Sequence, residues 1–483
     1  MGDLSLGLSF DDVLLVPQRS EVLPAEVDIS TRLSKDIPLN IPVISSAMDT
    51  VTEDGLAIAL AREGGIGVIH RNMPIEDQAD MVAKVKRSEN TVITDPFTMS
   101  ADLNIAELQR IMFEKGVNGF PVVDDENVLI GIVTSRDIWH IENENAPVSE
   151  VMTPKDRLVS APETTGLDEA RRILQKNRIE KLPLVDTEGR LAGLITAQDI
   201  EKRDMYLNSA KDDHGQLRVG AAIGVGEDYF ERARGVIEAG ADAVFIDAAT
   251  GHTERVLSVI ERLNSEFGKP VVAGNVVTAN GAADLIAAGA AAVKVGVGPG
   301  SICTTRVIAG VGTPQFSAIK NAAKVCRDAG VPLIADGGIR YSGDVVKAMA
   351  AGADLVMLGS LLAGCRESPG EMVNYQGRAW KEYRGMGSLK AMRKGSGDRY
   401  GQNSSGKLVA EGVEARVPYR GPLADTVFQL LGGLRSGMGY VGAKNLQCLR
   451  ERANFVRITP GGLKESHAHD ITITEEPVNY QTS

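Results

Sequence analysis

One cysteine stands inside the glycine-rich stretch GVGPGSICTTRVIAGVGTPQ, which covers residues 296–315. Cys303 is flanked by Gly-Pro-Gly-Ser-Ile and by Thr-Thr-Arg, a polar, turn-forming context that differs from the apolar surroundings of a core thiol. A thiol becomes nucleophilic only as its thiolate, which turn N–H groups or a nearby cation can stabilise. We therefore expect Cys303 to be exposed in a loop that holds a reactive thiol.

The other three cysteines have a different context. Cys326, Cys365 and Cys448 lie in helix-like segments, where a structural role is the ordinary interpretation. The four cysteines form no Cys-x-x-Cys pair and are too sparse for a disulfide framework, so we expect free thiols. We assign chemistry to Cys303 alone.

A second chemical signal is a set of glycines directly after short apolar runs. Asp336 precedes Gly337 and Gly338, and Gly359 precedes Ser360. Each glycine could merely close a tight turn, but on two consecutive strands they favour phosphate, because they expose backbone N–H groups. An ionised Asp336 carboxylate can accept hydrogen bonds from both hydroxyls of a ribose. The pattern predicts a nucleotide ligand.

Eight short apolar runs, each followed by a segment with helical spacing, must position these groups. The runs are residues 41–48, 65–70, 218–224, 243–248, 270–276, 292–298, 332–338 and 355–360. A strand–helix order repeated eight times predicts an α/β fold of the (β/α)8 TIM-barrel type, with reactive groups at the C-terminal ends of the strands. A doubly wound open sheet is the alternative.

An internal repeat interrupts this order between the second and third runs. The sequence from Gly119 (GFPVVD) recurs from Lys181 (KLPLVD), and GIVT from Gly131 recurs as GLIT from Gly193. The two copies, about 92–148 and 150–205, resemble a tandem pair of CBS domains. We therefore divide the chain into a first barrel part (1–91), an inserted CBS pair (92–205) and a second barrel part (206–483).

The inserted pair carries a possible ligand site of its own. The segments Thr134–Asp137 (TSRD) and Thr196–Asp199 (TAQD) match the ribose-contacting Thr-x-x-Asp element of CBS modules. The resemblance implies that adenine or guanine nucleotides bind between the copies. A structural or oligomerising spacer is the alternative.

Composition excludes several classes of protein. The chain has 483 residues, 43% of them hydrophobic, and a formal net charge of −12, which disfavours nucleic-acid binding through a globally basic surface. No apolar run approaches the roughly 20 residues that span a bilayer, and the N-terminus lacks a signal-peptide pattern. We expect a cytoplasmic protein without a membrane partner.

The cysteine loop, IADGGI, SSAMDTVTE and the CBS-like pair together resemble the IMP dehydrogenase family over essentially the whole chain. The resemblance implies oxidation of IMP by NAD to xanthosine monophosphate, the committed step to guanine nucleotides. It makes Cys303 the nucleophile that forms a thioimidate, which is then hydrolysed. The residues expected around IMP are Ser46, Met48, Ser301, Asp336, Gly338, Gly359, Ser360, Tyr383, Gly385, Met386, Gly387 and Glu411.

A long Gly/Ser/Lys/Arg-rich stretch, residues 385–413, resembles the mobile flap of this family. The flap would fold over the intermediate after NADH leaves and present Arg399 and Tyr400 to activate water. Because a guanidinium stays protonated in nearly all proteins, a relay through Thr305 and Glu411 is the physically easier base. The sequence leaves both bases open.

The resemblance also assigns the cofactor and cation sites. It implies that Asp247 binds a ribose hydroxyl of NAD, with Asn275, Lys294 and Gly296 in the same groove. This chain has Thr250 where many bacterial members have histidine, which leaves the stacking of NAD open. The family binds K⁺ with Gly298, Gly300 and Cys303, helped by a neighbouring subunit's segment that matches Glu465, Ser466 and His467. A homotetramer, or an octamer of paired tetramers, is the expected assembly.

Two other functions compete with this interpretation. GMP reductase shares the barrel, the cysteine loop and the phosphate glycines, but we expect it to lack the CBS pair and the Asp398-Arg399-Tyr400 flap. A non-catalytic nucleotide sensor would keep the CBS pair and use the barrel as a scaffold. Cys303, Thr305 and Arg399 together argue against the sensor.

Overall fold

The computed structural model describes residues 4–89, 93, 96–198, 200–201, 206–402 and 406–480. The chain forms two compact units, which we call the barrel unit (Met1–Ser88 with Asn208–Ser483) and the inserted unit (Glu89–Leu207). The chain leaves the barrel unit after a helix and returns before a strand. Each unit is described separately.

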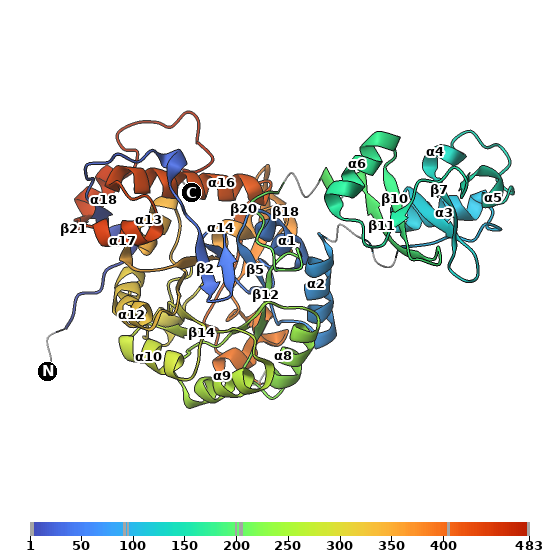
Figure 1. Ribbon diagram of the computed structural model, residues 1–483. Helices are drawn as coiled ribbons and strands as arrows, with labels where there is room; N and C mark the ends of the chain where they lie inside the picture. Colours follow the sequence, from blue (N-terminus) through green and yellow to red (C-terminus); the bar gives the residue numbers. More distant parts are fainter. Residues whose placement is uncertain are drawn as a thin grey trace. The chain divides into compact units, whose positions relative to one another are not determined.

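The barrel unit is built around eight parallel strands that close into a ring (Figure 1). Around the ring they follow the order β12 (Val219–Ile223), β13 (Ala243–Ile246), β14 (Val271–Val276), β15 (Ala292–Val295), β16 (Leu333–Asp336), β17 (Leu355–Leu358), β4 (Val43–Ser45) and β5 (Ile66–Ile69). All eight predicted runs contain one of these strands. The predicted TIM barrel is confirmed, and the open sheet is excluded.

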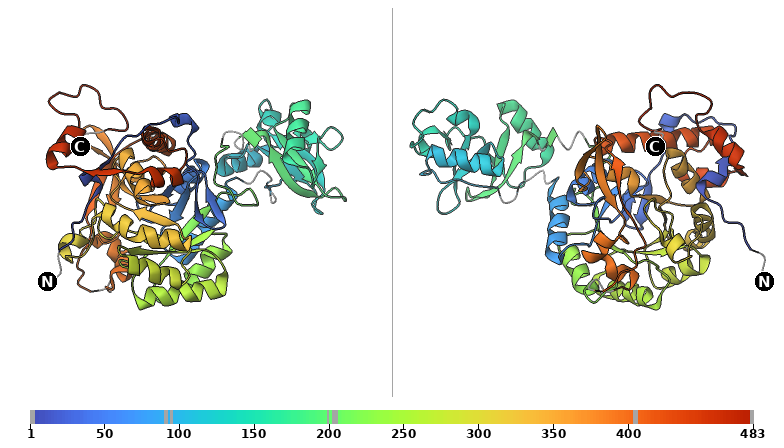
Figure 2. Two further views of the ribbon diagram at one scale, coloured as in Figure 1. Left: turned by 60° about the vertical axis from the view of Figure 1, so that its left-hand side comes forward. Right: turned by 180° about the vertical axis from the view of Figure 1, so that it is seen from behind.

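Helices surround the barrel, and each packs against the next (Figure 2). They are α1 (Asp54–Arg62), α2 (Ile75–Arg87), α8 (Tyr229–Glu238), α9 (Glu254–Phe267), α10 (Ala279–Ala287), α12 (Gln315–Ala329), α13 (Ser342–Ala351) and α16 (Leu423–Val441). The long α16 contacts both α13 and α1, so it closes the ring of helices. Within the residues that the structure describes, no helix is long and apolar enough to span a membrane.

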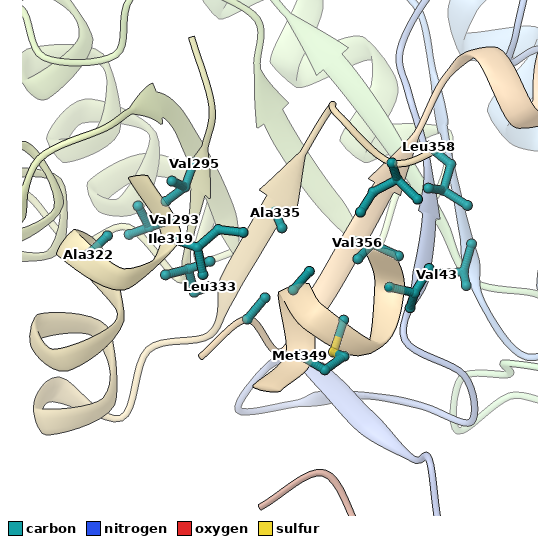
Figure 3. Packing of buried hydrophobic residues seen from close by; sticks show 14 of the residues in the cluster. Val43, Val293, Val295, Ile319, Ala322, Leu333, Ala335, Met349, Val356 and Leu358 are labelled. Atoms are coloured by element: carbon teal, nitrogen blue, oxygen red, sulfur yellow. The ribbon is translucent and has the colours of Figure 1, made fainter. Parts of the chain in front are cut away.

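Side chains alternate between the two faces of the barrel strands, so alternate residues belong to two different hydrophobic clusters. Val293, Leu333 and Val356 belong to the cluster that includes Ile319 of α12 and Met349 of α13 (Figure 3). The intervening residues, such as Ile334 and Leu355, form a second cluster with residues of the other strands. Burying each large aliphatic side chain contributes about 1.5–3 kcal/mol. Successive strand residues point to opposite faces, so short apolar runs can fill both layers.

Three smaller pieces complete the barrel unit. β1 (Val13–Leu15) pairs with β21 (Phe455–Arg457), β2 (Thr31–Ser34) pairs with β3 (Ile37–Leu39), and β18 (Met372–Tyr375), β19 (Arg378–Arg384) and β20 (Glu414–Pro418) form an antiparallel sheet. The predicted flap lies between β19 and β20 and contains α15 (Leu389–Arg393) and the 3-10 helix η3 (Ser396–Tyr400). The remaining short helices are η1 (Phe10–Asp12), η2 (Pro24–Glu26), α11 (Thr305–Ile308), α14 (Ser360–Ala363), α17 (Leu446–Arg452) and α18 (Pro460–Ser466).

The inserted unit consists of two copies of the same arrangement. The first contains α3 (Ile105–Lys115), β6 (Gly119–Val123), β7 (Leu129–Thr134), α4 (Ser135–Ile138), α5 (Val148–Val151) and β8 (Thr153–Pro154). The second contains β9 (Ala161–Pro162), α6 (Leu167–Asn177), β10 (Lys181–Val185) and β11 (Leu191–Thr196). α6, β10 and β11 repeat α3, β6 and β7 with the same lengths and spacing, as the sequence repeat predicts.

Candidate active site

A cavity of about 420 Å³ opens at the C-terminal ends of the barrel strands. It brings together nearly all the residues that the sequence assigns to substrate, cofactor and chemistry. Those that line it are Ser46, Met48, Asp247, Asn275, Lys294, Gly296, Gly298, Gly300, Ser301, Cys303, Asp336, Gly338, Gly359, Ser360, Tyr383, Gly385, Met386, Gly387, Arg399, Tyr400 and Glu411. They come from strand ends and from the flap, segments that are far apart in the chain.

Cys303 lies in the loop that follows β15, directly before α11, and is half-buried. Its Sγ is 3.2 Å from the hydroxyl Oγ1 of Thr305. The loop pairs with the returning arm of the flap: the Thr304 N–H donates to the Glu411 carbonyl at 2.9 Å, and Cys303 pairs with Gly412. The nucleophile candidate is therefore held against the base of the flap.

The other cysteines are in unreactive surroundings. Burial raises the pKa of the Cys326 thiol to about 12 and that of Cys365 to about 11. Both thiols are thus protonated at neutral pH, and a protonated thiol is a poor nucleophile. Cys448 is half-buried in α17, and all four cysteines are free.

The glycines after β16 need the conformational freedom that glycine provides. Gly337 and Gly338 have φ angles of 88° and 82°, in the left-handed region that other residues rarely adopt. Gly359 serves close approach instead, because a Cβ there would lie 2.9 Å from the hydroxyl of Tyr383. Ser360 begins α14 next to it. Glycines at these positions would let an anionic ligand approach the backbone closely.

A series of hydrogen-bonded polar groups, buried at Lys294 and Asn275 and half-buried at Asp336, connects three neighbouring strands of the barrel. Lys294 Nζ donates to Asn275 Oδ1 at 2.7 Å, and Asn275 Nδ2 donates to Asp336 Oδ2 at 2.9 Å. The same Asn275 amide donates to the Gly296 carbonyl at 2.8 Å. Burial lowers the pKa of Lys294, while the charges of Asp336 and Asp247 oppose this shift. These hydrogen bonds fix the orientation of Asp336.

The flap is folded into the cavity, and Arg399 forms an ion pair with Asp247 at the end of β13. Burial alone would lower the pKa of Arg399, but Asp247, Tyr400 and Asp336 together outweigh burial, and the net pKa lies well above its ordinary value. Burial likewise favours protonation of Asp247, yet the charges of Arg399, Arg71 and Lys294 hold its pKa below the usual range. Both partners are ionised at neutral pH.

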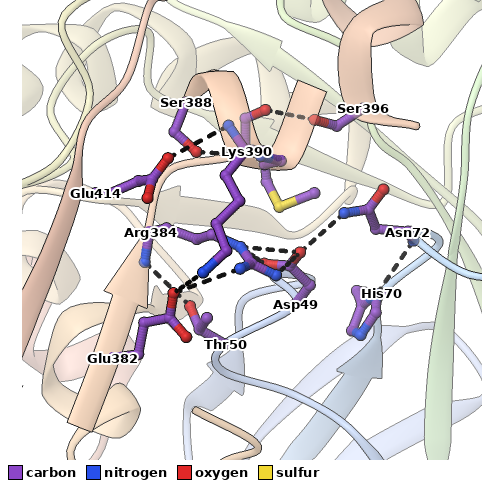
Figure 4. Close-up of polar contacts among 12 residues, drawn as sticks. Asp49, Thr50, His70, Asn72, Glu382, Arg384, Ser388, Lys390, Ser396 and Glu414 are labelled. Carbon is purple, nitrogen blue, oxygen red and sulfur yellow. Dashed lines mark hydrogen bonds and ion pairs between the residues drawn. The ribbon is translucent and has the colours of Figure 1, made fainter. Parts of the chain in front are cut away.

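The start of the flap is anchored by a polar cluster beside the cavity (Figure 4). Arg384, at the end of β19, forms a 2.6 Å ion pair with Asp49, and Asn72 donates to the same carboxylate at 2.8 Å. Lys390 of α15 contacts Glu382 at 2.8 Å, and the Ser396 hydroxyl donates to the Met386 carbonyl. These contacts fix the root of the flap to the loop after β4.

Several residues at the site were not assigned from the sequence. Gln315 is buried at the start of α12, and its amide donates to the carbonyls of Val295 and Asp336 at 2.9 and 3.1 Å. Phe10 and Arg340 line the cavity, and Arg71 contacts the flap. In the sequence, only its place as the last residue of the cysteine stretch connects Gln315 with the site. Glutamine side chains are mostly exposed in proteins, so a buried glutamine at the start of a helix indicates a specific role.

The predicted metal-binding tail lies elsewhere. Glu465 and Ser466 end α18, and the Ser466 hydroxyl donates to the Gly462 carbonyl at 2.8 Å. His467 Nδ1 is 3.1 Å from the hydroxyl of Tyr480. These three residues do not line the cavity, and their assignment, which depends on a neighbouring subunit, stays a prediction. Thr305 is also outside the cavity lining, but it contacts Cys303.

Comparison with known proteins identifies the family. The family model described as "IMP dehydrogenase / GMP reductase domain" matches residues 7–469. The chain belongs to this family. It is 60% identical over 478 residues to an inosine-5′-monophosphate dehydrogenase of Aquifex aeolicus, covering 98% of this chain and 97% of the relative. The corresponding protein of Bacillus subtilis is 55% identical over 480 residues, covering 99% and 98%.

A solved structure adds a correction. A GMP reductase variant from Trypanosoma brucei, in complex with guanosine 5′-monophosphate, matches with a TM-score of 0.90 and 41% identity, covering 97% of this chain and 99% of that one. A match of this extent includes the inserted unit. Our expectation that GMP reductases lack the inserted pair is therefore wrong for the Trypanosoma brucei enzyme. The inserted unit does not distinguish dehydrogenases from reductases, whereas the higher sequence identity of this chain to the dehydrogenases does.

Proposed function

We propose that this protein oxidises IMP to xanthosine monophosphate with NAD and water. The observation that carries the proposal is the position of Cys303 in one cavity with Asp336 and the glycines that follow β16 and β17. Dehydrogenases from Aquifex aeolicus and Bacillus subtilis, 60% and 55% identical over nearly the whole chain, support this activity over the reductase.

The first half-reaction is redox chemistry on the base of IMP. The Cys303 thiolate would bond to C2 of the hypoxanthine, and the hydride on C2 would leave to NAD, which serves as the oxidant. The products would be NADH and a thioimidate that joins Cys303 to the purine. The N–H groups beside Gly338 and Gly359 would hold the phosphate, and Asp336 would accept hydrogen bonds from the ribose hydroxyls.

The second half-reaction is hydrolysis. Water adds to C2, a base takes its proton, and the C2–S bond breaks to release xanthosine monophosphate and the Cys303 thiolate. Arg399 paired with ionised Asp247 is a poor proton acceptor, because its pKa is raised. We propose Thr305, 3.2 Å from the Cys303 sulfur, as the acceptor next to the reacting bond. Glu411, whose backbone accepts a hydrogen bond from Thr304, would complete the relay.

NAD and the folded flap would compete for the same carboxylate. We assign Asp247 to a ribose hydroxyl of NAD, and Asn275, Lys294 and Gly296 to the wall of the same groove. In the structure Arg399 takes up one carboxylate oxygen of Asp247. NAD would therefore bind only when the flap is out, and hydrolysis would begin when the flap returns.

A monovalent cation would bind at the first arm of the cysteine loop, where Arg306 donates to the carbonyls of Val297 and Thr313, at 3.1 and 2.5 Å. The resemblance to the family assigns K⁺ to the carbonyls of Gly298, Gly300 and Cys303, with Glu465, Ser466 and His467 of a neighbouring subunit in a homotetramer. When bound, K⁺ would fix the loop that carries the nucleophile.

The inserted unit would regulate this activity by binding adenine or guanine nucleotides. In the first copy, Asp137 accepts hydrogen bonds from the backbone and hydroxyl of Thr134 at 2.7 and 2.8 Å. In the second copy Asp199 lies outside the described residues. Sedimentation with and without nucleotide would show whether tetramers pair into octamers.

A cytoplasmic location fits a nucleotide enzyme with free thiols.

One assay tests the activity. The purified protein is mixed with IMP, NAD and K⁺, and NADH absorbance is followed, with Cys303→Ala as the inactive variant and Cys448→Ala as the matched control. A parallel sample receives GMP and a reduced nicotinamide dinucleotide. NADH formation that depends on Cys303 is the expected result. Turnover of GMP alone would establish the reductase, and no turnover in either sample would favour a sensor.

A further inference from the structure

Arg71, in the loop that follows β5, connects the barrel to the flap. Its guanidinium donates to both carboxylate oxygens of Asp398, from Nη1 at 3.0 Å and from Nη2 at 2.8 Å. The remaining nitrogen, Nε, is 3.5 Å from Oδ2 of Asp247. The Arg71 and Asp247 side chains are 8% and 9% exposed, so this pair is shielded from water, whereas Asp398 on the flap is 37% exposed. One guanidinium thus bridges a carboxylate of the barrel and a carboxylate of the flap.

The surroundings leave room for this pair. A Cβ on Gly224 would lie 3.0 Å from the Arg71 guanidinium carbon and 3.1 Å from Asp398 Oδ2, and a Cβ on Gly226 would also lie 3.1 Å from that oxygen. Neither glycine has a backbone angle that requires glycine. Any larger residue here would press on the closed pair, so these glycines provide space for the bidentate contact.

The charges balance whether the flap is folded in or out. With the flap in, two cations, Arg71 and Arg399, face two anions, Asp247 and Asp398. Asp398 and Arg399 are adjacent in sequence, so they leave together and remove one charge of each sign. Arg71 then stays beside Asp247, so neither of these two buried charges loses its oppositely charged neighbour. An unpaired buried charge would be costly, so this arrangement permits reversible opening.

We propose that Arg71 is a positioning residue that latches the flap through Asp398 and thereby sets the balance between the hydrolytic and NAD-binding states. The proposal rests on the proposed function. Arginine suits this role because its planar guanidinium binds a carboxylate with two parallel hydrogen bonds, whereas lysine presents a point charge. Weakening the latch shifts the population towards the open flap, where NAD competes for Asp247.

The first test needs no activity. Hydrogen exchange of the free protein is compared for wild type, Asp398→Asn, Arg71→Lys and Gly226→Ala, with Arg234→Gln as the control. Arg234 pairs with Glu231 on the exposed surface of α8, 3.1 Å away. We expect faster exchange in peptides covering residues 389–402 for the first three variants, with strands β12 and β13 unchanged. Unchanged exchange in the flap would overturn the latch even if the protein proved inactive.

The second test separates the latch from a purely structural role. With Asp398→Asn, the NADH burst should stay within about twofold of wild type, while steady-state turnover falls about tenfold or more. Inhibition by high NAD should appear at lower concentrations, because NAD rebinds to the open intermediate. Arg71→Lys should show the same pattern. Equal loss of burst and turnover, or unchanged NAD inhibition, would contradict the proposal, whereas a wild type without a burst would refute the proposed function instead.

Discussion

The guanidinium of Arg399 is paired with the carboxylate of Asp247, which directly follows β13, the fourth strand of the barrel in chain order. The flap and the barrel thus share a carboxylate that we assign to NAD. A single site can perform redox chemistry and hydrolysis in turn if these two partners of Asp247 alternate. The position of Arg399 is therefore the clearest physical link between the flap and the two-step reaction.

Replacing Arg399 with alanine should slow hydrolysis and spare hydride transfer. The guanidinium occupies Asp247 only when the flap is folded in, so its loss should affect the step after NADH release. We expect an NADH burst close to that of wild type, followed by turnover slowed by about 10²-fold or more. Stopped-flow absorbance resolves the two phases. Equal loss of both phases would be incompatible with this role.

The variant Thr305→Val tests whether Thr305 is the base that takes the proton of water in the hydrolysis step. It removes the hydroxyl 3.2 Å from the Cys303 sulfur while keeping a similar shape. If Thr305 accepts the water's proton, this variant should also show a burst with slow turnover. Normal turnover in Thr305→Val would assign the base to Arg399.

Asn275→Leu should weaken IMP binding indirectly, because Asn275 holds Asp336 and is not itself assigned to IMP. The change removes the amide that joins Lys294 to Asp336, leaving both charges without that bridge. Hydrogen bonds to charged groups contribute about 1.5–3 kcal/mol, so we expect the KM for IMP to rise about tenfold or more. Steady-state kinetics with varied IMP measure the effect. A KM within twofold of wild type would show that Asp336 is held by other contacts.

The four thiols should differ sharply in reactivity. Burial raises the pKa of Cys326 to about 12 and that of Cys365 to about 11, so neither forms much thiolate at neutral pH. In a Cys448→Ser background, we expect iodoacetamide to modify Cys303 alone, and IMP to protect it. Peptide mass spectrometry identifies the modified residue. Modification of Cys326 ahead of Cys303 would contradict the assignment.

A buried ion pair of the barrel unit gives a prediction about stability and pH. Lys86 Nζ lies 2.7 Å from Asp212 and 3.0 Å from Asp242, which joins the end of α2 to the segment that re-enters the barrel. Burial favours the protonated form of Asp212, but Lys86 and the backbone N–H groups of Gln216 and His214 together lower its pKa. A carboxyl whose folded pKa is lowered stabilises the fold above its unfolded pKa, about 3.9, and loses this contribution as pH falls through the folded value.

Asp212→Asn should therefore be destabilised at neutral pH, by about 1.5–3 kcal/mol for one hydrogen bond to a charged group. The difference from wild type should shrink as the pH falls below about 4. Urea unfolding followed at several pH values measures it. A difference that stays constant or grows in acid would show that the Asp212 carboxylate is not the source.

The sequence predicted the barrel well, because its strands are short apolar runs that alternate with helices and end in chemically distinctive residues. The residues around Cys303 and Asp336 could be predicted for the same reason, because they lie where the sequence pattern changes from strand to loop. The role of Arg71 could not be predicted, because it depends on contacts with residues more than 170 positions away. Gln315 was missed because a single polar residue at a helix start carries no periodic signal.

In the proposed mechanism, Cys303 forms a covalent bond to the purine of IMP during turnover. Rapid mixing with IMP and NAD, followed by an acid quench within the burst and mass spectrometry of the peptides, detects this bond. We expect a nucleotide adduct on the peptide that contains Cys303, present only when NAD is added and accumulating further in Arg399→Ala. NADH formation without any adduct on Cys303 in either protein would contradict it.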